Sequence, residues 1–195
     1  GNVFSFGDAR SFGSMAGSHL NSPIVGMAAT PTGGGYWLLG ADGGIFSFGD
    51  AGFFGSTGGI RLNRPVVDLA PSPSGQGYWL LGADGGVFTF GDAGFSGSTG
   101  GVRLNRPVVS LAASPGGGYW LVAEDGGIFS FGAPFHGSLP GLGRGGDLRG
   151  LRIRSIASGA GYYILGPEGS VFAFGTAPFL GSTPGSVAAD LLVHR

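Results

Sequence analysis

The feature of this sequence that most restricts its fold is a motif that recurs every 41 to 43 residues. An apolar residue is followed by Phe-x-Phe-Gly, and the five copies begin at Val3, Ile45, Val87, Ile128 and Val171. Ten residues before the first Phe of the last four copies stands an aromatic pair: Tyr36-Trp37, Tyr78-Trp79, Tyr119-Trp120 and Tyr162-Tyr163. Such self-similarity is typical of architectures built from stacked supersecondary units.

Each repeat contains four short apolar runs separated by turn residues. In the copy that begins at Pro65, these runs predict strands at Val66–Ala70, Tyr78–Gly82, Val87–Phe90 and Phe95–Ser98. The Asp-Gly step between the second and third runs is typical of a tight hairpin. No window shows the apolar spacing of an amphipathic helix, so we predict essentially no helix.

Four antiparallel strands in about 42 residues are the length of one β-propeller blade. We therefore predict an all-β, five-bladed β-propeller forming a single domain over residues 1–195, with a four-bladed ring as the alternative. The closing blade takes strands three and four from the N-terminus and strand one from Leu192-Val193, while its second strand has no sequence here. The predicted repeats are 1–22 (partial), 23–64, 65–106, 107–151, 152–185 and a closing strand in 186–195.

The composition excludes several classes of protein and partner. The chain has 45 Gly, ten Arg against eleven acidic residues and a net charge of −1, which favours neither disorder nor binding to nucleic acid. No apolar run is long enough to insert into a membrane. The lack of Cys excludes disulfides and thiolate metal sites. Because the chain begins at Gly1 without a leader, we expect a fragment or a processed form.

Most of the conspicuous side chains are explained by the scaffold. Neighbouring strand residues point to opposite faces, so each aromatic pair is predicted to pack between blades. The repeated Asp residues are interpreted as turn formers, and the three His occupy different repeat positions, so no metal site and no cofactor are predicted. No nucleophile elbow is present. We therefore predict no catalytic residues and no enzyme, although a small hydrolase would use Asp68, Glu124 or the terminal acids.

The connection between the fourth and first strands is the candidate ligand site. It carries Arg and Asn at matching places in two copies, and in the fourth copy it is replaced by a longer Arg-rich loop from Leu139 to Arg154. The candidate binding residues are Arg61, Asn63, Arg64, Arg103, Asn105, Arg106, Arg144 and Arg149. Arg donors suit hydroxyls, carboxylates or phosphates. The alternative is that these Arg side chains form ion pairs with the Asp-Gly turns and join neighbouring blades.

The segments Gly35 to Ala51 and Gly77 to Ala93 resemble a repeat common in secreted and cell-surface proteins of actinobacteria. The resemblance covers essentially the whole chain and implies an appended, non-catalytic module with a secreted or cell-surface location. The architecture is also similar to that of the five-bladed, tachylectin-like lectins. No sugar-binding residue transfers from those lectins position by position.

Three functions follow as hypotheses. The first is a lectin-like extracellular module that binds carbohydrate, with a glycan or cell-wall polymer as its partner. The second is a structural or protein-interaction scaffold that binds a neighbouring domain or protein and no small ligand. The third is a small glycan-acting hydrolase. In each case we expect a monomer without nucleic-acid binding or membrane insertion.

Overall fold

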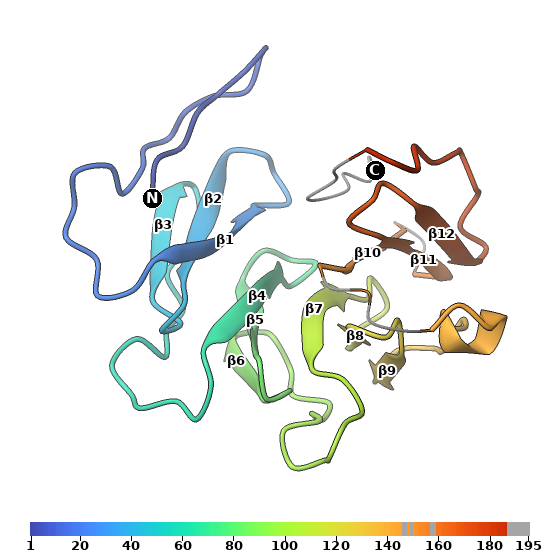
Figure 1. Cartoon of the computed structure of the whole chain (residues 1–195). Helices are drawn as coiled ribbons and strands as arrows, with labels where there is room; N and C mark the ends of the chain where they lie inside the picture. The colour runs from blue at the N-terminus through green and yellow to red at the C-terminus, as the bar shows by residue number, and fades with distance from the viewer. Residues whose placement is uncertain (146–147, 149, 157–158, 187–195) are drawn as a thin grey trace. The chain divides into compact units, whose positions relative to one another are not determined.

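The computed structural model describes residues 1–145, 148, 150–156 and 159–186, and within them it is all-β apart from one short 3-10 turn, η1 (Pro140–Leu142). Twelve strands form four three-stranded antiparallel sheets in sequential order (Figure 1). The strands are β1 (Ile24–Ala29), β2 (Gly35–Gly40), β3 (Ile45–Gly49), β4 (Val66–Pro71), β5 (Gly77–Gly82), β6 (Val87–Gly91), β7 (Val108–Ala113), β8 (Tyr119–Ala123), β9 (Ile128–Phe131), β10 (Arg152–Ser155), β11 (Gly161–Leu165) and β12 (Val171–Gly175).

The first three predicted strands of the four complete repeats are confirmed, with bounds that differ by a residue or two. The middle strands β2, β5, β8 and β11 are buried along their whole length, which matches their continuous apolar sequences. The first strands of three copies contain a bulge, and in β4 it falls between Val66 and Asp68.

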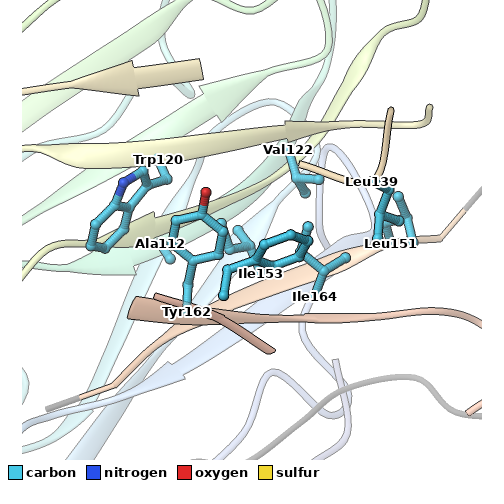
Figure 2. Close-up of a cluster of buried hydrophobic side chains, with 9 residues drawn as sticks. Ala112, Trp120, Val122, Leu139, Leu151, Ile153, Tyr162 and Ile164 are labelled. Carbon is cyan, nitrogen blue, oxygen red and sulfur yellow. The ribbon is translucent and has the colours of Figure 1, made fainter. Parts of the chain in front are cut away.

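The chain divides into two compact units, which are described separately. The first comprises residues 1–82 and 88–93, and the second comprises residues 83–87 and those from Gly94 onward. In the first unit, buried side chains of β2 and β5 form a core around Trp37, Tyr78 and Leu80. In the second unit, β8 and β11 form an equivalent core around Trp120 and Tyr162 (Figure 2). The aromatic pairs therefore lie in the core, as predicted.

The predicted fourth strand of each blade is wrong. Phe95–Ser98 and the matching segments of the other copies belong to no strand in the structure. Gly97 has a φ of 133° and Gly55 one of 134°, a left-handed conformation that interrupts a strand. The described sheets consequently have three strands rather than four.

A tyrosine hydroxyl binds the segment that was predicted to pair as the fourth strand. The Tyr78 hydroxyl accepts a hydrogen bond from the Phe54 amide at 3.1 Å and donates one to the Gly55 carbonyl at 2.6 Å. The same arrangement occurs at the first residue of each aromatic pair, in Tyr36, Tyr78, Tyr119 and Tyr162. Each segment is thus held by the tyrosine of the following copy.

The two terminal contributions to the predicted closing blade have different outcomes. Val3 to Phe6, predicted as a strand, belongs to no sheet among the described residues, because no neighbouring strand pairs with it. The predicted closing strand at Leu192-Val193 lies outside the described residues. The number of blades therefore stays a prediction.

Candidate functional site: the rim loops and the exposed phenylalanines

The connections that carry the candidate Arg and Asn residues are called rim loops here, and the first one spans residues 57–66. It is held against the Asp-Gly turn of its own copy. The Thr57 amide donates to the Gly43 carbonyl at 3.1 Å, and the Thr57 hydroxyl donates to the Asp42 carbonyl at 3.2 Å. At the other end of the loop, the Val66 amide donates to the Ala41 carbonyl at 2.8 Å. Between these fixed ends, the predicted site residues Arg61, Asn63 and Arg64 are exposed.

The second rim loop repeats this geometry. The Thr99 amide donates to the Gly85 carbonyl at 3.0 Å, and the Val102 amide donates to the Thr99 carbonyl at 2.9 Å. Arg103, Asn105 and Arg106 are exposed in the same way as their counterparts in the first loop. The predicted proximity of these loops to the Asp-Gly turns is therefore confirmed within each copy.

For three of the four arginines of these loops, the predicted Arg–Asp ion pairs are not found within the described residues. Arg61, Arg64 and Arg103 form no ion pair with any residue that the structure describes. The acids of the Asp-Gly turns are instead used locally, since the Asp42 carboxylate accepts from the Gly44 amide at 2.9 Å and Asp84 makes the same bond to Gly86 at 3.1 Å. The interpretation of these acids as turn formers is confirmed.

The Arg-rich connection of the fourth copy, predicted from Leu139 to Arg154, is shorter in the structure because β10 begins at Arg152. Arg144 lies at the end of η1, with its guanidinium carbon 5.9 Å from the centre of the Phe172 ring. Arg149 lies outside the described residues. Arg152 is part of β10 and donates to the Val109 carbonyl at 3.4 Å, so the strand rather than the loop holds it.

A second polar cluster lies where the β1–β2 turn meets the Phe-Gly-Asp turn. The Asp50 carboxylate accepts hydrogen bonds from the hydroxyls of Thr32 and Thr30, and together they lower the pKa of Asp50. In the next copy, hydroxyl hydrogen bonds from Ser74 and Ser72 lower the pKa of Asp92. The main partners of these two carboxylates are therefore side-chain hydroxyls from the turn between the first two strands of the same copy.

The acids and histidines singled out in the sequence are scattered in the described part of the chain. No three His, Cys, Asp or Glu side chains within it are placed to hold a metal ion. Asp68 is buried, and its carboxylate accepts from the Leu69 amide at 3.0 Å. His136 packs against the rings of Tyr162 and Trp120, with centroids 5.6 and 6.1 Å away. None of the helices among these residues is long and apolar enough to span a membrane.

The exposed phenylalanine that recurs in four copies was not identified from the sequence. Each follows Ala-Gly or Ala-Pro after the Phe-x-Phe-Gly motif, and their exposed fractions are 62% for Phe53, 63% for Phe95, 59% for Phe135 and 63% for Phe179. The Ala two residues earlier is buried in three of these copies. The recurrence of Phe at this place was visible in the sequence, but its direction was not, because it was assigned to a strand.

No family model matches the chain, and no curated protein sequence matches it either. Several solved structures, however, match the fold of this chain. The Myceliophteria thermophila Cps50 (Swd1) β-propeller domain matches with a TM-score of 0.54 and 12% identity, over 88% of this chain and 59% of that one. Chaetomium thermophilum Sqt1 matches with a TM-score of 0.52 and 19% identity, over 82% and 48%.

A structural genomics protein of unknown function from Bacteroides thetaiotaomicron matches with a TM-score of 0.51 and 14% identity, over 78% of this chain and 41% of that one. The chain thus spans between about two fifths and three fifths of the length of these neighbours. The likeness supports the sheet architecture described above, and the fold is that of β-propeller proteins.

Proposed function

We propose that this chain is a non-catalytic β-propeller module that serves as a protein-interaction scaffold. The observation that carries the proposal is that each of four successive copies has one large apolar ring exposed at the matching place, namely Phe53, Phe95, Phe135 and Phe179. An exposed apolar ring at the matching place of each copy offers a recurring contact to a protein partner, because removing apolar surface from water is favourable. Full burial of a fully exposed Phe side chain is worth about 1.5–3 kcal/mol, so covering Phe53, which is 62% exposed, stabilises a complex by less than that.

Folding does not require these rings. In the first unit Ala51 is buried, and the residue after the exposed Phe53, Phe54, turns inward and packs against Tyr78 with ring centroids 5.7 Å apart. The core is therefore complete without Phe53. A side chain whose apolar surface stays in water in the isolated chain gains free energy when a partner covers it.

Carbohydrate binding draws less support from the aromatic residues. Lectin platforms need exposed ring faces, whereas Trp37 and Trp120 are fully buried. Their indole nitrogens already donate to backbone carbonyls of their own copies, at 2.7 Å to Gly52 and 2.8 Å to Pro134. The exposed groups that remain for a sugar to contact are the Arg and Asn residues of the rim loops and the four exposed phenylalanine rings.

Two further parts of the proposal rest on the sequence. We propose a five-bladed ring, supported by the half-copy at the N-terminus and the strand-one sequence at Leu192-Val193. We also propose a secreted or cell-surface location, supported by the resemblance of Gly35 to Ala51 to the actinobacterial repeat.

The test compares two surface variants of the full chain. One replaces the four exposed phenylalanines by Ser, and the matched control replaces the exposed Ile60 and Val102 of the rim loops by Ser. Partners captured by cross-linking are purified and titrated back against each variant. We expect the phenylalanine variant to keep its melting temperature and to lose binding, and the control to keep both.

A glycan array with the same chains decides between the scaffold and the lectin. Binding of a polysaccharide that survives in the phenylalanine variant and disappears when Arg61 and Arg103 are replaced by Ala would overturn the scaffold proposal. It would then support the carbohydrate hypothesis.

A further inference from the structure

The first fifteen residues have the backbone contacts of the second half of a complete copy. The Met15 amide donates to the Gly1 carbonyl at 3.0 Å, as the Thr57 amide donates to the Gly43 carbonyl at 3.1 Å one copy later. The Tyr36 hydroxyl accepts from the Phe12 amide at 3.3 Å, which is the contact Tyr78 makes in the next copy. The segment is therefore held in the geometry of a repeat.

The turn after the Phe-x-Phe-Gly motif has the same geometry too. The Ala9 amide donates to the Phe6 carbonyl at 3.3 Å, and in the next copy the Ala51 amide donates to the Phe48 carbonyl at 3.4 Å. The motif glycine has a φ between 63° and 69° in all five copies, at Gly7, Gly49, Gly91, Gly132 and Gly175.

What the N-terminal copy lacks is the strand beside it. In the following copy, β3 pairs antiparallel with β2, with Phe48 opposite Tyr36 and Phe46 opposite Leu38, and both phenylalanines are half-buried. The matching Phe4 and Phe6 are 74% and 82% exposed. Figure 1 shows this segment, in deep blue, as a loop that extends beyond β3 without a strand.

The described part of the chain contains no spare strand of the required kind. Each Gly-Tyr strand, β2, β5, β8 and β11, is the middle strand of its sheet and is paired on both edges. Residues 187–195 contain no aromatic side chain in their sequence. A second copy would have to dismantle one of its own sheets to supply the strand.

The last copy, near the C-terminus, shows which side chain is left exposed when no Gly-Tyr strand follows. Leu180 takes the place that Phe54 and His136 hold in earlier copies, where each packs against the tyrosine of the next copy. No Tyr follows it in the sequence, and Leu180 is 87% exposed.

We propose that the segment Val3–Gly7 is an acceptor for an antiparallel β-strand of the sequence type Gly-Tyr-aromatic-apolar-apolar, supplied by a polypeptide segment outside these 195 residues. Addition of a strand to an exposed edge combines main-chain hydrogen bonds with pockets for alternate side chains. The repeat sets the register: the donor Gly lies opposite Gly7, its Tyr opposite Phe6 and its fourth residue opposite Phe4. The segment uses residues other than the four exposed phenylalanines of the scaffold proposal and does not depend on that proposal.

The absence of Cys from the chain allows a direct test of register. The probe is a synthetic peptide with the sequence of residues 23–44, in which Trp37→Cys is the only substitution, and the full chain carries Ser5→Cys. Because Trp37 lies opposite the residue equivalent to Ser5, we expect the two thiols to form a disulfide under mild oxidation. A peptide with Leu38→Cys instead is the control, since neighbouring strand residues face opposite ways.

A second measurement follows the affinity of the fluorescently labelled peptide. The variant Phe4→Ser with Phe6→Ser should keep the melting temperature of the chain, since both rings are exposed. It should weaken peptide binding at least about tenfold, which corresponds to about 1.4 kcal/mol. Replacing Ile60 and Val102 by Ser should leave the peptide affinity unchanged.

Three results would overturn the proposal. One is the absence of saturable binding by the folded chain at millimolar peptide. Another is equal cross-linking of the two cysteine peptides, which would show contact without register. The third is a dimer of the chain that disappears with Phe4→Ser and Phe6→Ser, which would make a second copy the occupant. None of them bears on partner binding through Phe53 and its equivalents.

Discussion

The hydroxyl of Tyr78 donates a hydrogen bond to the carbonyl oxygen of Gly55 at 2.6 Å, which ties the strand β5 to the end of the preceding copy. The same hydroxyl accepts from the Phe54 amide, so one oxygen satisfies a backbone donor and a backbone acceptor. Strand pairing would have satisfied these groups within the blade. Here the next copy does so, and adjacent repeats therefore depend on each other for stability.

Replacing Tyr78 by Phe should lower the free energy of unfolding by about 1–3 kcal/mol, because the ring stays while two backbone groups lose their partner. Tyr163→Phe is the control. The Tyr163 hydroxyl only donates to the exposed Pro178 carbonyl at 2.8 Å, which water can hydrate, so about 0.5–1.5 kcal/mol is expected. Chemical denaturation measures both. Equal losses in the two variants would contradict the role of the paired contact.

The buried tyrosines also predict a loss of stability at alkaline pH. Burial raises the pKa of Tyr162 from 10.0 to about 12, against the opposing effect of its hydrogen bonds to His136 and Gly137. The folded state keeps a proton that the unfolded state releases in this window. The stabilisation is therefore complete below pH 10.0 and is lost as the pH rises towards about 12.

Denaturation at a series of alkaline pH values tests this, with Tyr162→Phe as the comparison. The variant should show a shallower fall in the free energy of unfolding between pH 10.0 and about 12. Identical slopes would show that Tyr162 ionises equally in both states. Burial also raises the pKa of Tyr78 and Tyr119, so part of the slope should persist.

The sequence predicted the three strands of each sheet because their signals are local. In β5 a continuous apolar run indicates a middle strand, and the Asp84-Gly85 step indicates the hairpin that follows it. The fourth segment could not be assigned in this way. Whether residues 95–98 form a strand depends on Gly97 and on the Tyr119 hydroxyl, which comes from the following copy.

The candidate site was also predicted only in part, because some of its features are local in the sequence and others depend on contacts with distant residues. The recurrence of Arg and Asn in the rim loops is visible in the sequence, and so is their place beside the Asp-Gly turns. The direction of Phe95 is not, because an alternating pattern cannot show which face of a segment without strand pairing meets water. The carboxylate of Asp92 likewise found hydroxyl partners, Ser74 and Ser72, from a turn distant in sequence.

Gly97 should tolerate no side chain. An added Cβ would lie 2.6 Å from Cδ1 of Phe131, at a φ of 133° that L residues rarely adopt. Gly97→Ala should therefore destabilise the chain by about 1–3 kcal/mol, the cost of a strained backbone conformation. Gly101→Ala has open space around it and should change stability by less than about 0.5 kcal/mol. A neutral Gly97→Ala in thermal denaturation would contradict the packing of this segment.

The rim arginines should be dispensable for folding, in contrast to the ion-pair alternative. Arg61 and Arg103 are exposed and form no ion pair within the described residues, so the double substitution Arg61→Ala and Arg103→Ala should change the free energy of unfolding by less than about 0.5 kcal/mol. Arg144→Ala is the positive control, because it removes a guanidinium 5.9 Å from the centre of the Phe172 ring and should cost about 0.5–1 kcal/mol. The measurements are made at low and high salt. A larger loss in the double variant that disappears at high salt would show that these arginines do join the blades by ion pairs, since salt screens exposed charges.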